Sequence, residues 1–414
     1  MKVTAAQARQ AARFADLTWD PAVKDWRSHI NLVHPHKAVL TLLCLAFAAG
    51  QCAFRHVEDF CSDLSAATTK KLGLTRTVSD STVYRMVTHQ KLEGLRESVK
   101  EQVLQMAKDK VIKRDRLEDG VATFDGKEFF SSTTNGVDGA KVSVNESAGV
   151  ITSSLMAVRA VLSSSLVTPF LDMEIIGEKA GEAPAFRILF PRVLEAFGHL
   201  FEIVTGDSGI GCRENAKLVV DSKKAYVFSL KGIQKSVEKA AIDLFAACSN
   251  APYQDKGEVR DGGTMTREIV AVSVDEHSAT EFEGSKQFWR VIQRLVVGGK
   301  LLKEEVRLFV VSLDMGVIGP EKALALVRIH WAIENNHNWT MDMKLMEDDV
   351  QPCQQTKESL SVVCWLRMMG YNMVSAFRAS APEKDRQPQS WKRTMDKLRD
   401  ALCVDIKEVA VPIV

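Results

Sequence analysis

The chain has 414 residues, 46% of them hydrophobic, so it is long enough for two or three domains and shows no compositional sign of disorder. Its eight cysteines are scattered without CxxC pairs, which is typical of buried thiols in a reducing compartment and argues against a cysteine zinc site. The net charge is +1, but residues 1–114 contain 18 Lys and Arg against 11 Asp and Glu, whereas the other 300 contain 36 against 42. A basic segment before a mildly acidic one fits a nucleic-acid-binding part joined to a catalytic part that gathers carboxylates, although proteins that never meet DNA also show this asymmetry.

Residues 1–114 have the periodicity of helices joined by short turns. Helices are predicted over residues 5–15, 36–49, 57–64, 81–90 and 92–112. The longest apolar run of the chain, AVLTLLCLAFAAG, is too short to cross a bilayer, so we expect it to form a buried core helix and expect no membrane partner.

The stretch VSDSTVYRMV lies within this helical region. Ser79 and Asp80 are N-cap candidates for a helix that carries Tyr84 and Arg85. Such a helix is either the recognition element of a helix-turn-helix, in which case Arg85 contacts DNA, or a plain element of a helical bundle.

From residue 121 the pattern changes to that of strands. Three successive β-rich runs, VATFD, ITSSLMAVRAVL and VTPFLDMEII, precede a helix over 183–197 and a fourth strand, LFEIVTGD. A short helix over 214–220 and the strand AYVFSL follow. This order of elements is that of the ribonuclease H-like fold, so we expect an α/β catalytic domain with a mixed five-stranded sheet flanked by helices.

Residues 232–305 interrupt that order with helical segments, a Gly-rich stretch and one clear strand, TREIVAVSV, before the strand EVRLFVVSL restores it. We therefore predict four parts. They are a helical N-terminal DNA-binding domain (1–114), the first part of the catalytic domain (115–231), an inserted subdomain (232–305), and the second part of the catalytic domain with C-terminal helices (306–414).

Two aspartates are expected where strands end. FDGK places Asp125 at the end of the first strand, where the chain turns at Gly126, and TGDSG places Asp207 at the end of the fourth. Adjacent strand ends line the crevice of an open sheet, and two carboxylates brought together there repel each other unless a cation lies between them. Hard oxygen ligands suit Mg²⁺ or Mn²⁺ better than zinc. Taken singly, each Asp before Gly is also ordinary turn chemistry.

The stretch RIHWAIENNHNW contains a third carboxylate, Glu334. If the stretch is an α-helix, His330, Glu334 and His337 share one face and could form a metal site by themselves. Alternatively, Glu334 completes a two-metal site for in-line phosphoryl transfer with the two aspartates. A third interpretation of this stretch is a plain surface helix. Trp331 and Trp339 are either core anchors of this helix or platforms on which a base stacks.

Several longer motifs run nearly from end to end. They are PHKAVLTLLCLAFAAG, FRHVEDF and VSDSTVYR in the N-terminal part, and FDGK, VTGDSGIGCRENAKLV, AYVFSLKGIQ, GGTMTRE and HWAIENNHNWTMDMKLMEDD beyond it. In these motifs the chain resembles the DDE transposases of bacterial insertion sequences, in the group that includes the H-repeat-associated proteins. The resemblance implies a metal-dependent endonuclease that hydrolyses a phosphodiester at each element end and joins the freed 3′ hydroxyl to target DNA.

Carried over residue by residue, the resemblance implies that Asp125, Asp207 and Glu334 are the catalytic residues and the ligands of two Mg²⁺ or Mn²⁺ ions. The side chains implied to contact DNA are Lys127, Lys231, Gln234, Arg267 and His330. The implied partners are terminal inverted repeats and target DNA, bound by a homodimer, and the implied location is the prokaryotic cytoplasm, at the nucleoid. The chain has His337-Asn338 where the group usually has Leu-His. Replacing His337 by alanine is expected to have little effect on cleavage.

Two other functions fit parts of the sequence. A decayed or domesticated transposase would bind DNA without cutting it. A hydrolase of another class would use His330, Glu334 and His337 to hold iron or zinc. Metal dependence of the activity distinguishes these alternatives from the transposase.

Overall fold

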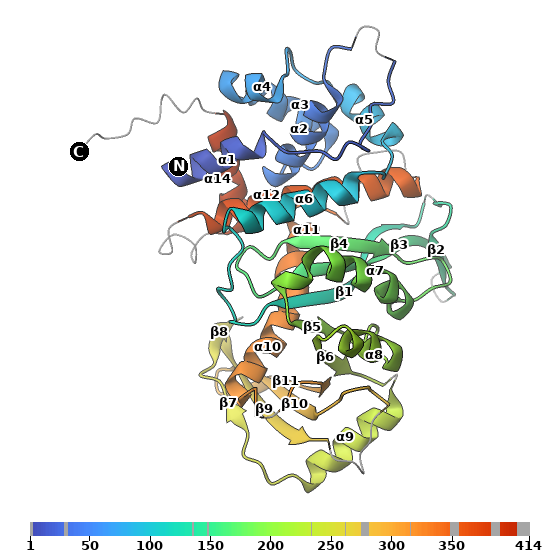
Figure 1. Cartoon of the computed structure of the whole chain (residues 1–414), viewed down its shortest axis with the longest axis vertical. Helices are drawn as coiled ribbons and strands as arrows, with labels where there is room; N and C mark the ends of the chain where they lie inside the picture. Colours follow the sequence, from blue (N-terminus) through green and yellow to red (C-terminus); the bar gives the residue numbers. More distant parts are fainter. Residues whose placement is uncertain are drawn as a thin grey trace, which may run out of the picture.

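The computed structural model describes residues 3–403 apart from 29–31, 135, 147–148, 233, 261, 275–280, 315, 348–355 and 382–389. Helices from both halves of the chain form one end of the molecule, and a large mixed sheet with its flanking helices forms the rest (Figure 1). Asp348 and Asp349, at the end of the last motif quoted above, lie outside the described residues.

The helical end begins with six helices that largely match the predicted ones. They are α1 (Ala5–Phe14), α2 (His36–Ala48), α3 (Phe54–Asp63), α4 (Ala66–Leu72), α5 (Asp80–His89) and α6 (Leu95–Lys108). Helix α5 begins at its predicted cap, because the Ser79 side chain accepts a hydrogen bond from the backbone N–H of Thr82. Helix α4 was not predicted.

Helix α2 is the predicted core helix. Every residue in it except Lys37 is buried, and each fully buried leucine stabilises the fold by roughly 1.5–3 kcal/mol. Helix α12 (Lys357–Ala379) packs across it with the backbones nearly touching. A Cβ atom added at Gly370 of α12 would lie 2.8 Å from the carbonyl oxygen of Cys44, so only glycine fits at this crossing. The C-terminal helix α14 (Trp391–Cys403) contacts both α1 and α12.

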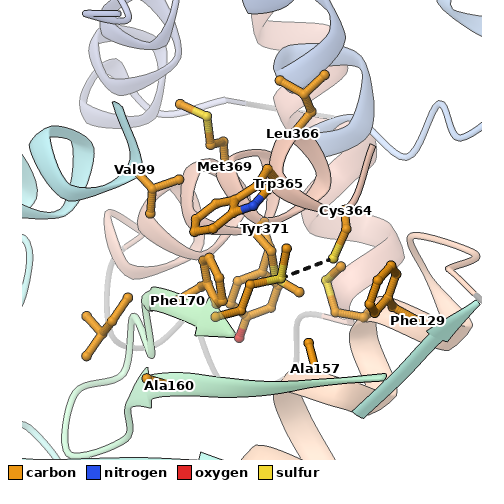
Figure 2. Packing of buried hydrophobic residues seen from close by; sticks show 14 of the residues in the cluster. Val99, Phe129, Ala157, Ala160, Phe170, Cys364, Trp365, Leu366, Met369 and Tyr371 are labelled. Carbon is orange, nitrogen blue, oxygen red and sulfur yellow. Dashed lines mark hydrogen bonds between the residues drawn. The ribbon is translucent and has the colours of Figure 1, made fainter. Parts of the chain in front are cut away.

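The helical end and the sheet share one hydrophobic core. Figure 2 shows side chains of α6, α12 and the sheet in a single cluster, with Val99 and Trp365 on the helical side and Phe170 on the strand side. The rings of Phe170 and Trp365 meet edge to face, with centroids 5.5 Å apart. The two ends of the molecule are therefore packed together rather than tethered by a linker.

The sheet contains eleven strands among the described residues, in the order β2-β3-β1-β5-β6-β11-β10-β9-β7, with β4 paired to β3 and β8 to β9. The strands of its first half are β1 (Val121–Ser132), β2 (Lys141–Asn145), β3 (Val150–Leu162), β4 (Phe170–Ile175), β5 (Ile203–Gly206) and β6 (Ala225–Leu230). Strand β3 is antiparallel to β1 and β4, whereas β5 and β6 run parallel to β1. The predicted sheet of five strands is therefore too small.

The missing strands come mostly from residues 232–305. After α9 (Lys235–Ala247), the strands β7 (Tyr253–Gln254), β8 (Glu258–Arg260), β9 (Gly263–Ser273), β10 (Gln287–Val297) and β11 (Lys300–Val311) continue the same sheet. Strand β10 escaped prediction because QFWRVIQRLVV spaces its apolar residues about as a helix does. The turn that follows favours a strand over a helix, because Gly298 and Gly299 both have positive φ and close a β10–β11 hairpin.

Helices cover both faces of the sheet. On one face, Phe124 of β1 packs against Phe186 and Phe190 of α7 (Glu182–Phe197). On the other face, α10 (Pro320–Ala332) covers Val121, Val227 and Phe309. Helix α8 (Arg213–Asp221) follows β5. No described helix is both long and apolar enough to span a bilayer.

Candidate active site

Strand register brings Asp125 and Asp207 together. The parallel pairing of β1 with β5 ends at Phe124 opposite Gly206, and the next residue of the chain after each of these is an aspartate. Asp125 does not end its strand as predicted, because β1 continues to Ser132 as the partner of β3 and the chain does not turn at Gly126. The two aspartates nevertheless lie beside each other at the point where the pairing of β1 with β5 ends.

The loop after β5 holds the Asp207 carboxylate by backbone contacts. Its Oδ1 accepts hydrogen bonds from the N–H groups of Gly209 (3.0 Å) and Ile210 (3.2 Å). The Gln234 side chain in turn donates to the carbonyl oxygens of Ser208, at 3.1 Å, and of Gly211. Gln234 therefore braces the loop that carries Asp207. Burial raises the pKa of Asp207, whereas the backbone hydrogen bonds and then Lys231 lower it.

Asp125 is buried, with 8% of its surface exposed, and its Oδ2 accepts a 2.7 Å hydrogen bond from the Asn338 side chain. Burial and then the negative charges of Asp207, Glu334 and Glu182 raise the pKa of Asp125 to about 8. Asn338 is part of the His337-Asn338 departure from the family pattern, and its contact with Asp125 gives that departure a structural role.

Glu182, which the sequence did not single out, is a fourth carboxylate at this place. It is the first residue of α7, and its side chain occupies the space beside Gly126 and Gly209, where a Cβ atom on either glycine would collide with its carboxylate. Burial, and then the charge of Asp207, raise the pKa of Glu182 to about 7. The two glycines therefore form a cradle for this carboxylate between the strand of Asp125 and the loop of Asp207.

Glu334 lies in a π-helical stretch, Ile333–Asn338, between α10 and α11 (Trp339–Met343). Single π-turns inside α-helices are rare and occur frequently at functional sites. Burial raises the pKa of Glu334; Arg307 lowers it, and the charge of Asp207 raises it. Glu334 thus lies within electrostatic reach of both aspartates.

The four carboxylates fit a hard divalent cation by their chemistry. All their donors are oxygens, the side chains repel one another without a counter-ion, and the cradle beside Gly126 and Gly209 admits a carboxylate and no Cβ atom. Within the described residues, no three His, Cys, Asp or Glu side chains lie close enough to hold one ion as they stand. A cation would therefore have to draw these carboxylates closer together.

The alternative site of His330, Glu334 and His337 does not form. His330 is 2% exposed and lies 3.3 Å from the Thr205 hydroxyl on β5, whereas the His337 ring packs against Phe170 and Tyr371. The π-helical stretch widens the turn, so that the spacing expected for an α-helix no longer places the three side chains on one face. Burial lowers the pKa of His330 to about 4 and that of His337 to about 3.

Replacing His337 by alanine is expected to destabilise the protein by about 1–3 kcal/mol, because the change empties space between two aromatic rings in the core. Urea unfolding measures this loss, and His199→Ala, an exposed histidine, is the control. A variant of unchanged stability that had lost bound zinc would contradict this role for the ring.

The residues predicted to contact DNA differ in their surroundings. Lys127 is paired with Asp342 at 2.8 Å, and Lys231 is exposed just beyond β6. Arg267 is 5% exposed, and its guanidinium is bound to Asp255 and Glu258.

Arg85 lies on α5 at the helical end, away from the carboxylates (Figure 1). With Arg27 and Arg76 it lines a hollow of about 560 Å³. The two tryptophans near Glu334 also differ: Trp331 packs partly buried against the α10 side of the sheet, whereas Trp339 is 43% exposed.

Comparison with known proteins confirms the resemblance at the level of sequence. No family model matches the chain. The chain is similar to "Putative transposase YncI" of Escherichia coli O157:H7, with 25% identity over 42% of this chain and 46% of that protein. It is similar to "H repeat-associated putative transposase YhhI" of Escherichia coli K12, with 27% identity over 42% of this chain and 46% of that protein. The matches span just under half the length of these curated relatives.

Among solved structures, the chain is similar to a piggyBac transposase in a synaptic complex with hairpin DNA. The sequence identity is 10% and the TM-score 0.45, over 98% of this chain and 79% of that one. A TM-score of this size does not establish a shared fold, so the resemblance depends on the sequence comparisons.

Proposed function

We propose that the chain is a DNA transposase that cuts phosphodiesters at the ends of an insertion sequence and joins them to target DNA. The observation that carries the proposal is the register of β1 and β5, which sets Asp125 beside Asp207 on a chain similar to transposases. The pairing of β4, β3, β1, β5 and β6 supports a ribonuclease H-like core, in which residues 232–305 enlarge the sheet.

The proposed metal ligands are Asp125, Asp207 and Glu334, with Glu182 as a fourth carboxylate. When bound, two Mg²⁺ or Mn²⁺ ions would activate the attacking oxygen and stabilise the leaving oxygen of an in-line displacement. Neighbouring groups keep the carboxylates in place: the Asn338 side chain donates a hydrogen bond to Asp125, and the backbone N–H of Gly209 donates one to Asp207.

The proposed partner is DNA, with terminal repeats and target bound by a dimer. Lys231 lies at the carboxyl end of β6 and lowers the pKa of Asp207, so its charge reaches the site where a scissile phosphate would bind. At the helical end, Arg76 and Arg85 are exposed beside the hollow and supply the second place where phosphates would bind. The proposed location, the nucleoid, follows from this partner.

The test uses purified protein and a supercoiled plasmid that carries the coding region with its natural flanks. We expect nicks with free 3′ hydroxyls at the borders of the element in Mg²⁺ or Mn²⁺, and no nicks in EDTA. Binding without cutting in either metal would identify a DNA-binding protein derived from a transposase. A covalent link between protein and DNA would contradict the mechanism.

Glu182→Gln is expected to reduce this cleavage on the order of 10-fold to 100-fold and to weaken Mn²⁺ binding measured by calorimetry, because it removes one charged donor beside Asp207. Glu178→Gln, an exposed carboxylate shortly before α7, is the matched control. Equal cleavage and equal Mn²⁺ affinity in the two variants would exclude Glu182 as a ligand.

A further inference from the structure

One edge of β11 is unpaired where it passes the active site. Strand β6 ends at Leu230, which pairs with Leu308, and β11 extends beyond this point through residues 303–307. Along this stretch, which we call the β11 edge, the described residues pair with β10 on one side only. The β11 edge therefore lies beside the carboxyl end of β6, where Lys231 follows.

Two hollows meet at the β11 edge. One, of about 570 Å³, is lined by Glu334, Trp331 and Arg328. The other, of about 560 Å³, is lined by Lys231, Arg290 and Phe245. Both are also lined by Glu305 and Arg307, so the hollows adjoin at these two residues. Together they lead from Glu334 of the candidate site, past the β11 edge, to the surface between β10 and α9.

Two of the cations along this path, Arg290 and Lys231, have no ion pair within the described part of the chain. The Nε atom of Arg290 is buried and has no hydrogen-bond partner among the described residues, and its guanidinium lies 5.0 Å from the centre of the Phe245 ring. Arg307 is bound to Glu305 at 2.7 Å and lies 5.3 Å from the centre of the Trp331 ring.

We propose that the two hollows and the β11 edge bind the sugar-phosphate backbone of the DNA strand next to the bond that is cut, with Arg290 and Arg307 as phosphate contacts. This inference rests on the proposed function. Guanidinium groups held against aromatic rings keep their donors directed and bind phosphate through more than one N–H. Two such guanidinium groups, Arg290 on Phe245 and Arg307 on Trp331, line the path and could contact phosphates along one strand.

The test measures how binding of the full chain to a fluorescein-labelled duplex of about 30 base pairs depends on NaCl between about 50 and 200 mM. The slope of log K against log salt is negative, and each lost phosphate contact makes it shallower by about 0.9. We therefore expect Arg290→Ala and Arg307→Ala each to make the slope shallower by about that amount. The lysine variants, Arg290→Lys and Arg307→Lys, are expected to keep it, which separates lost charge from lost folding.

Arg294→Ala is the matched control, because Arg294 lies on the same hairpin, is ion-paired with Glu268 and Glu304, and lines neither hollow. Equal slopes for the wild type and both alanine variants would overturn the inference. If the slopes were equal but the wild type still cut DNA in Mg²⁺, the proposed function would remain intact. A wild type that bound no DNA and cut none would overturn both.

Discussion

Asp125→Asn is expected to abolish metal-dependent cleavage and, in EDTA at pH 8, to raise the melting temperature. The pKa of Asp125 is about 8 in the folded protein, against an ordinary value of 3.8, because the carboxylate is buried among other carboxylates. The folded state thus binds the proton more tightly than the unfolded state, so stability is lost as the pH rises from about 4 towards 8. An asparagine at position 125 can still accept the hydrogen bond from Asn338 but carries no charge, so the variant should regain a few kcal/mol of stability at pH 8.

Thermal melting between pH 5 and pH 8, with and without Mg²⁺, measures this effect together with the nicking assay. The gain in the variant should shrink as the pH falls, because the wild-type carboxyl is then protonated in the folded state. Added Mg²⁺ should stabilise the wild type more than the variant. Asp221→Asn, at an exposed ion pair with Lys217, serves as the control. Retained cleavage would show that Asp125 is not part of a metal site, and a lower melting temperature at pH 8 would show that its charge does not destabilise the folded protein.

Glu347→Gln is expected to destabilise the protein by about 3–5 kcal/mol, because it leaves a buried guanidinium without its counter-charge. Arg159 of β3 and Glu347 are 0% and 1% exposed, and two hydrogen bonds of 3.0 and 2.8 Å join them. Glu347 follows α11, so this ion pair fastens the segment that carries Glu334 and Asn338 to the strand beside β1.

Urea unfolding measures this loss, and a drop in cleavage should accompany it at temperatures where the variant stays folded. The exposed ion pair of Lys217 and Asp221 is the control, since breaking it is expected to lower stability by at most about 1 kcal/mol. A cost of that small size for Glu347→Gln would show that the buried pair does not hold the segment in place.

Part of the site was predictable because it depends on local patterns. The apolar runs before FDGK and TGDSG placed Asp125 in one strand and Asp207 after another, although not the end of the first strand, and the cap at Ser79 placed α5. Glu182 was not predictable, because an acidic residue in the first turn of a helix is ordinary and is explained by the helix dipole alone. Its proximity to Gly126 and Gly209 arises from packing between segments distant in sequence.

The alternative prediction of a metal site within the helix around Glu334 failed for a different reason. The sequence suggested one helical face shared by His330 and His337, and that inference assumed an unbroken α-helix. The π-helical turns are set by the tertiary contacts of the stretch, with His330 drawn to Thr205 and His337 to Tyr371. No periodicity in the sequence encodes such a change of pitch.

The close crossing of α2 and α12 has a consequence for synthesis of the protein. The apolar surface of α2 is made early, but Gly370, which fits against Cys44, emerges only after more than three hundred further residues. Until then the nascent chain exposes a strongly hydrophobic helix, a state that favours aggregation or binding to chaperones. Translation that stops before α12 should therefore yield an insoluble product, and the helical end should reach its folded state only once the C-terminal helices have been made.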